Sequence, residues 1–278
     1  MGSQRILDLG CGTGANLRYL APRLGGGSGA GFWGHQEWLC LDKDPQLLAD
    51  LSRRTAAWAR DQGWPVETLP EDQGLVILAE VPGDWRVRKL VGDLAQGAEW
   101  LPVAPGTLVT ASALLDLVSG DWLAGLLRVC AQAGAPLLLA LSYDGRVELS
   151  PAHPLDETLI TLVNAHQRGD KGLGPALGPS APARLAELAP PLGLELELAP
   201  SDWELGAKET ELQSALVAGW VAAAGEQAAR IGPSSSALRE GIRRWHQERR
   251  GQMAAGRLRI RVGHQDALLW PGPGVPPS

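Results

Sequence analysis

Short apolar runs alternate with helical patterns along the first half of the chain. The runs are four to seven residues long, which is the length of buried strands. Strands that alternate with helices predict an α/β fold, in which helices cover both faces of a mostly parallel sheet. The predicted strands are residues 6–9, 38–41, 75–79, 85–91, 108–113, 136–141, 194–198 and 258–262, with 75–79 and 85–91 as a hairpin. One predicted helix follows the glycines of the first turn, one starts at Asp44-Pro45, one lies near 121–130, and one covers 155–168.

The pattern divides the chain into four parts. Residues 1–142 hold the regular alternation and are expected to form the nucleotide-binding core. Residues 143–190 contain one amphipathic helix and a loop rich in Gly and Pro, which we interpret as a helical lid after the fifth strand. Residues 191–270 would complete the sheet with a sixth and a seventh strand, and 271–278 would be a disordered tail.

Composition narrows the class of protein. The 278 residues carry a net charge of -6, which argues against nucleic acid as a partner, because phosphate binding depends on clustered Lys and Arg. The one basic cluster, 239–261, is interpreted first as a solvated helix face, with an anionic partner as the alternative. Three cysteines lie far apart, so neither a disulfide framework nor a metal site is expected. With no apolar run of membrane length and no signal peptide, we expect a cytoplasmic protein without a membrane partner.

Three glycines follow the first predicted strand in "DLGCGTGAN". A phosphate-binding loop would need Lys-Ser or Lys-Thr after Gly14, where the chain has Ala15 and Asn16. A dinucleotide fingerprint fits only as Gly10-x-Gly12-x-x-Ala15, so an NAD-dependent oxidoreductase stays an alternative. The third interpretation adds Asp8, two positions before the first glycine.

The string D-x-G-x-G-x-G resembles motif I of the class I S-adenosylmethionine (SAM) dependent methyltransferases. The resemblance implies a Rossmann-like, seven-stranded, mostly parallel sheet whose last edge strand is reversed. Members of this family usually carry helical sequence before motif I, so a chain that begins at the first strand is expected to be a fragment or a compact variant. The resemblance assigns SAM as cofactor to Asp8, Gly10, Cys11, Gly12, Gly14, Asn16, Asp42, Lys43, Asp93 and Leu94.

Two carboxylates follow later strands. Asp42 ends the second predicted strand, where a carboxylate can accept hydrogen bonds from both ribose hydroxyls, although an aspartate there can also cap the next helix. Asp93 stands in "VGDLA" and resembles the family's adenine-side carboxylate, with a surface turn as the alternative. We favour the cofactor for Asp42 because it follows the glycine turn.

Polar residues that suit an acceptor gather after the fifth strand. Tyr143 and Asp144 come directly after the strand, with Asp144-Gly145 as a turn dipeptide in the alternative. His166 is a candidate base, since its ordinary pKa is near neutrality, but a packed core histidine is the other interpretation. The candidate catalytic residues are Tyr143, Asp144 and His166, and the candidate substrate-binding residues are Asn164, Gln167, Asp170, Lys171 and Trp203.

These features predict methyl transfer from SAM to an oxygen or nitrogen of a small polar metabolite. The family's signature for methylating bases and glutamine, Asn or Asp with Pro-Pro and an aromatic, is missing from "TASALLDL" after the fourth strand. That absence favours a small-molecule acceptor. A non-catalytic SAM-binding protein remains the second alternative, and the oligomeric state is open.

Overall fold

The computed structural model describes residues 4–25, 34–69, 74–79, 83–232 and 235–273. Of the disordered tail expected over 271–278, residues 274–278 lie outside the described residues, whereas Pro271 is the last residue of the final strand. The strands are β1 (Gln4–Leu9), β2 (Gln36–Asp42), β3 (Val66–Thr68), β4 (Gly74–Ala79), β5 (Gly83–Val91), β6 (Thr107–Ser112), β7 (Leu137–Ser150), β8 (Leu194–Pro200), β9 (Trp203–Leu205) and β10 (Arg259–Pro271). The helices are α1 (Ala15–Gly25), α2 (Pro45–Asp61), α3 (Gly120–Ala133), α4 (Asp156–Gln167), α5 (Ala181–Leu188), α6 (Thr210–Arg230) and α7 (Ser236–Ala254).

The strands form one mixed sheet with a parallel centre, which confirms the predicted α/β fold. The strand order is β3-β4-β5-β2-β1-β6-β7-β10-β8, and β9 pairs with β10. Strands β5, β2, β1, β6 and β7 run parallel, whereas β10 is antiparallel to both β7 and β8. The sheet of the described chain therefore has ten strands, more than the seven expected. Two of them, β4 and β10, run against the parallel core, and β10 lies inside the sheet instead of at its edge.

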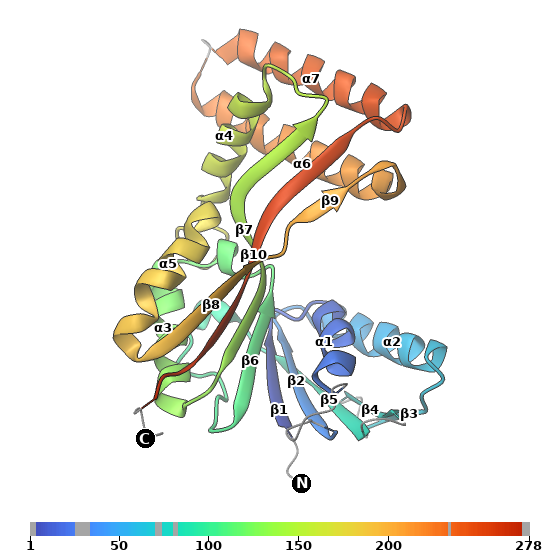
Figure 1. The fold of residues 1–278 in the computed structure, drawn as a ribbon, viewed down its shortest axis with the longest axis vertical. Coiled ribbons are helices and arrows are strands. Elements are labelled where there is room, and N and C mark those ends of the chain that lie inside the picture. Colours follow the sequence, from blue (N-terminus) through green and yellow to red (C-terminus); the bar gives the residue numbers. More distant parts are fainter. Residues whose placement is uncertain (1–3, 26–33, 70–73, 80–82, 233–234, 274–278) are drawn as a thin grey trace.

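Helices cover both faces of the core sheet (Figure 1). Ile6 of β1 packs in the cluster that α1 and α2 form with the sheet, whereas its neighbour Leu7 packs in the cluster on the side of α3 and α5. Successive side chains of a strand point to opposite faces, so β1 has to be apolar on both sides. This is why the strand appears in the sequence as a continuous apolar run.

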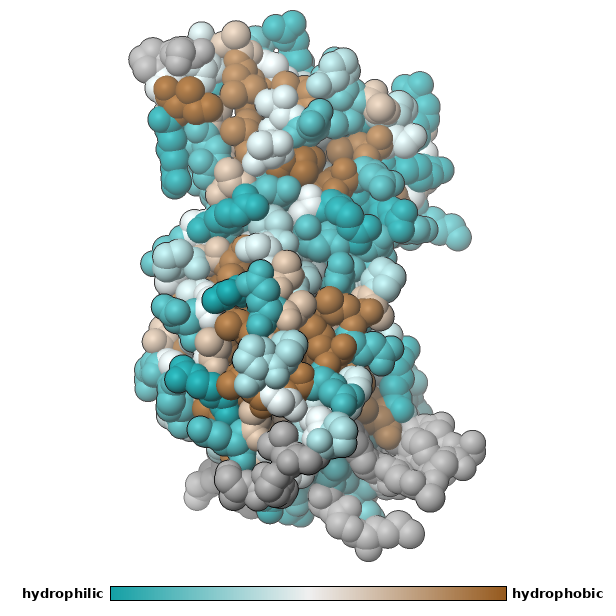
Figure 2. Space-filling view, turned by 60° about the vertical axis from the view of Figure 1, so that its left-hand side comes forward, coloured by the Kyte–Doolittle hydropathy of each residue, from teal (hydrophilic) through white to brown (hydrophobic). Residues whose placement is uncertain are grey.

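Strands β7 and β10 continue beyond the core into a second lobe, at the top of Figure 1. There the pair, joined by β9, packs against α4, α6 and α7 around a separate apolar cluster that includes Trp220, Trp245 and Ile260. Figure 2 shows the two lobes as separate bulges joined by a narrower waist. The helix predicted over 155–168 is α4, and it packs against α6 in this lobe. The expected boundary at residue 143 falls inside β7.

A buried ion pair joins α4 to α7 in the second lobe. Arg249 is fully buried, and its Nη2 donates to both carboxylate oxygens of Asp156, at 2.5 and 2.7 Å. Asp156 also accepts hydrogen bonds from Trp245 Nε1 at 2.7 Å and from the His153 N–H at 2.8 Å. The basic cluster of the sequence thus supplies one buried cation, which holds the lobe together.

None of the helices in the described residues is long and apolar enough to span a membrane.

Candidate active site

The glycine turn between β1 and α1 has left-handed backbone at all three glycines. The φ angles are 60° at Gly10, 52° at Gly12 and 78° at Gly14. A Cβ atom at Gly14 would lie 2.9 Å from Leu51, whereas one at Gly12 would meet no atom within 4 Å. Gly14 is therefore needed for both backbone and packing, and the turn leaves open space beside Gly12 where a ligand can approach the main chain.

Asp8 lies at the end of β1 with no exposed surface. Its Oδ1 accepts a hydrogen bond from Asn16 Nδ2 at 2.8 Å, but its Oδ2 is buried without a partner. Burial raises the pKa of Asp8 to about 7; the hydrogen bond from Asn16 opposes this rise, and the nearby charge of Asp42 adds to it. A buried carboxylate oxygen without a donor is suited to a cationic group such as the ammonium of a bound amino acid.

Asp42 joins the glycine turn to the end of β2. Its Oδ2 accepts the Gly12 N–H at 2.9 Å, and its Oδ1 accepts the Asp44 N–H at 3.0 Å. Asp44, not Asp42, caps α2, since its own side chain accepts the Gln46 N–H. A carboxylate has about four acceptor positions, so about two of those of Asp42 remain for the hydroxyls of a ligand.

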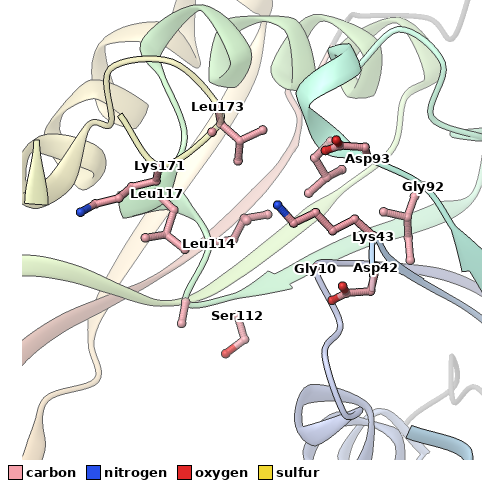
Figure 3. Close-up of a pocket in the computed structure, with 14 residues that line it drawn as sticks. Gly10, Asp42, Lys43, Gly92, Asp93, Ser112, Leu114, Leu117, Lys171 and Leu173 are labelled. Atoms are coloured by element: carbon pink, nitrogen blue, oxygen red, sulfur yellow. The ribbon is translucent and has the colours of Figure 1, made fainter. Parts of the chain in front are cut away.

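A pocket lies at the carboxyl ends of the parallel strands, between the core loops and the loop after α4 (Figure 3). Asp42, Gly92 and Asp93 lie on one side of it, and Lys43 extends between them and the opposite wall. Asp93 also caps a short helical turn by accepting the Ala95 N–H at 2.9 Å, so both interpretations of Asp93 fit the structure. The lining residues are Gly10, Leu41, Asp42, Lys43, Gly92, Asp93, Leu94, Ser112, Ala113, Leu114, Leu117, Lys171, Gly172 and Leu173.

The far wall of the pocket comes from the loop that follows α4. Asp170 accepts the Gly172 N–H at 2.7 Å, and a bridge between Asp170 and Pro175 closes this loop on itself. Lys171 and Leu173 then line the pocket. Within the expected lid, this loop lines the pocket, α5 packs on the core sheet, and α4 packs in the second lobe.

The other predicted acceptor residues do not line this pocket. Tyr143 donates to Asn164 Oδ1 at 2.7 Å, and this bond ties β7 to α4. Asp144 pairs with Arg146 at 2.6 Å, and His166 pairs with Glu226 of α6 at 3.0 Å. The remaining two are Gln167, the last residue of α4, and Trp203 on β9, whose ring lies 4.8 Å from that of His264.

Sequence reasoning missed two groups of residues. Ser112, Leu114 and Leu117 line the pocket from the segment after β6. The sequence analysis considered this segment only because it lacks the signature for methylating bases and glutamine. His264 and Asp116 are buried polar residues that the sequence analysis did not single out. A carboxylate after a strand end was a usable signal for Asp116, whereas nothing in the local sequence marks His264.

Comparison with known proteins gives a likeness of structure only. No protein-family model and no curated protein matches the sequence. Along almost its whole length the chain is similar in structure to many class I SAM-dependent methyltransferases.

Three examples show how distant these likenesses are. The cyclopropane synthase MmaA2 from Mycobacterium tuberculosis is 13% identical, with a TM-score of 0.41 over 97% of this chain and 79% of that protein. A Geobacter sulfurreducens SAM-dependent methyltransferase, solved with S-adenosylhomocysteine (SAH), is 16% identical, with a TM-score of 0.40 over 96% and 84%. Phosphoethanolamine N-methyltransferase 2 from Haemonchus contortus is 15% identical, with a TM-score of 0.41 over 97%; the chain spans 49% of its length. Likenesses this distant carry no argument about activity, which has to come from the site.

Proposed function

We propose that the protein is a SAM-dependent methyltransferase whose acceptor is an oxygen or nitrogen of a small polar metabolite. The observation that carries the proposal is Asp42, held by the Gly12 and Asp44 N–H groups at the pocket wall with acceptor positions to spare. Such a carboxylate suits the two hydroxyls of a ribose. Asp93 and Leu94, further along the same wall, suit the adenine.

The glycine turn supports SAM over a dinucleotide. The Gly12 N–H is donated to Asp42 and the Gly14 N–H to the Cys11 carbonyl, so neither is free to bind a phosphate. Asp8 and Asp42 also place two carboxylates at the turn, close enough for the charge of Asp42 to raise the pKa of Asp8. A diphosphate would be repelled there, whereas the ammonium of a methionine group would be attracted.

The protein's part in the reaction is to bind, orient and exclude water. SAM supplies an activated methyl group for in-line transfer. The open backbone at Gly12 admits the methionine part, and the loop of Lys171 and Leu173 closes the side of the pocket opposite Asp42. Orienting the acceptor and excluding water lower the barrier without a covalent intermediate on the protein.

Calorimetric titration with SAM, SAH and NAD tests this proposal. We expect micromolar binding of SAM and SAH and no binding of NAD. Asp42→Ala should weaken SAM binding more than tenfold while the protein stays folded. The matched control is Asp44→Ala, which removes the cap of α2 and should cost about 1 kcal/mol of stability but leave SAM affinity unchanged.

Each other outcome has a meaning. NAD binding without SAM binding would favour the oxidoreductase. Binding of SAM without methyl transfer to any member of a metabolite panel would favour a non-catalytic SAM-binding protein. Equal SAM affinity in the Asp42→Ala variant and the parent protein would contradict the assignment of the ribose site.

A further inference from the structure

One face of the sheet lacks a covering helix where β2 and β5 run side by side. Parallel strands are usually covered by helices on both faces. Residues 92–106, which connect β5 to β6, form a short helical turn and no α-helix. The apolar cluster of α3 and α5 accordingly reaches β5 at Leu90, which is partly buried. Nearer the start of β5, the exposed residues on this face are Arg86 and Arg88.

The pairing of the strands brings charged side chains together on this face. Arg5 of β1, Glu37 of β2 and Arg86 of β5 pair in register across three neighbouring strands. Arg88 follows two positions later on β5, in register with Leu39. Neighbouring strands lie about 4.8 Å apart, and residues two apart along a strand about 6.6 Å. The three arginine side chains therefore start within roughly 12 Å of one another and can converge on one ligand.

The three arginines line a groove near the amino ends of β1 and β2, at the lower end of the sheet in Figure 1. The pocket of Asp42 lies at the other end of the same strands. Leu7, Leu39 and Pro102 give the groove apolar walls. Its volume is about 160 Å³, which is less than the roughly 300–1,000 Å³ of pockets for drug-sized ligands. The groove therefore suits a small ligand.

The cations of the groove outnumber its carboxylates. Within the described part of the chain, Arg86 and Arg88 form no ion pair. Glu37 is the carboxylate of the lining, and its Oε2 lies 3.9 Å from Arg5 Nε. Both of these side chains are exposed, so their pair contributes about 0–1 kcal/mol. Arg5 can consequently leave Glu37 for another anion at little cost.

The charge of the groove is opposite in sign to that of the whole protein. The chain carries a net charge of -6, whereas three arginines and one glutamate line the groove. Asp84, the carboxylate two residues before Arg86, is paired with His35 and does not line the groove. Guanidinium groups match the planar, two-oxygen geometry of phosphate and carboxylate. An excess of two positive charges therefore matches a ligand with two negative charges.

We propose that this groove binds a small dianion, a phosphate monoester or a dicarboxylate, between Arg5, Arg86 and Arg88. The two arginines of β5 offer unpaired guanidinium groups, and Arg5 exchanges Glu37 for the ligand. The apolar walls contact the carbon skeleton of the ligand. The site lies apart from the pocket of the proposed function, and it does not depend on that function.

Titration with inorganic phosphate and with malonate, followed by NMR at constant ionic strength, tests the proposal on the full chain. The backbone amides of residues 5, 37, 86 and 88 should shift together and reach saturation. Arg86→Gln and Arg88→Gln should each weaken binding by about tenfold, because each removes a charge-assisted hydrogen bond. Glu37→Gln should instead strengthen binding by about threefold, because it removes a like charge beside the anion.

Arg53→Gln is the matched control. Arg53 is an exposed arginine of α2 that pairs with Asp50, so its loss should leave the affinity for both anions unchanged. The melting temperature of each variant checks the fold. Tighter binding of phosphate would assign the groove to a phosphate ester and tighter binding of malonate to a dicarboxylate, and either result supports a dianion site.

Three results would overturn the inference: no saturable shift, shifts confined to Lys43 and Asp93 of the other pocket, or equal affinity in the parent and both arginine variants of β5. SAH affinity separates this inference from the proposed function. Arg86→Gln and Arg88→Gln should bind SAH as the parent does, so loss of the anion site leaves the proposed function standing. Failure of SAH to bind would overturn the proposed function and leave this site standing.

Discussion

The two lobes differ in how they satisfy one carboxylate each, Asp156 of the second lobe, which is half-buried, and Asp8 of the core, which is buried. In the second lobe, Asp156 receives donors from Arg249, Trp245 and the His153 backbone, which leaves its oxygens well satisfied. In the core, Asp8 has one carboxylate oxygen that is buried without a partner. Unsatisfied polar groups are costly when buried, so a fold keeps them where a ligand completes them. The contrast between these two carboxylates indicates that Asp156 is structural and that Asp8, at the core edge, is the one that a ligand can complete.

The largest expected effect is the loss of stability when the ion pair of the second lobe is broken. Asp156→Ala leaves the Arg249 guanidinium buried and unpaired, which should destabilise the protein by about 3–5 kcal/mol in urea unfolding. Replacing both residues, as Asp156→Leu with Arg249→Met, should recover most of that loss, since an apolar pair leaves no charge buried. SAH affinity of the double variant should equal that of the parent; a weaker affinity would show that the lobe contributes to the site.

A smaller effect of opposite sign, a gain in stability, is expected when Asp8 of the core is replaced. Burial raises the pKa of Asp8 from 3.8 to about 7, so the folded protein binds the proton more tightly than the unfolded chain. The stability from this group is complete below pH 4 and is lost as the pH rises through 7, a linkage of up to about 4 kcal/mol at pH 8. Asp8→Asn removes the cost of ionising this buried group at high pH but buries an amide without a partner. We therefore expect the variant to be more stable than the parent by about 1–3 kcal/mol at pH 8.

The shape of the pH profile makes this test specific. The parent should lose stability relative to Asp8→Asn between pH 4 and 8, measured by urea unfolding without ligand. Asp50→Asn is a control of the other sign, because the hydrogen bond from Arg53 lowers the pKa of Asp50. That variant should lose stability at pH 7 and match the parent at pH 3. A constant difference between parent and Asp8→Asn across the range would mean that Asp8 is ionised in the folded protein.

The smallest expected effect concerns His166. Its partner Glu226 is 62% exposed, and exposed ion pairs contribute about 0–1 kcal/mol. Glu226→Gln should therefore shift the melting temperature by no more than a few degrees and leave SAH affinity unchanged. A large loss of SAH affinity would place this pair in the site and reverse the comparison of the lobes.

The core was predictable because its chemistry is local. Three glycines with left-handed backbone, an apolar strand before them and an aspartate two positions earlier are all adjacent in sequence. The second lobe depends instead on pairing between distant segments. Gly145 has a positive φ, as a turn residue would, yet it lies inside β7 because β10 pairs with it on either side. Local patterns predict such a position as the end of a strand.

The surroundings of His264 escaped the sequence for the same reason. His264 lies beside Tyr143 and Trp203 only because β10 pairs with both β7 and β9. Helix α4 has the apolar stripe of an amphipathic helix, but the stripe does not say which surface it covers. It packs on the second lobe, so the loop around Lys171 takes the place expected for the helix.

Strands β7 and β10 both pass through the two lobes, and their pairing resumes on either side of two register shifts. The lobes therefore share a paired double strand instead of a linker. The regularly paired backbone amides of β7 and β10 should accordingly exchange with deuterium only when the whole protein unfolds, so heat should melt both lobes in a single transition.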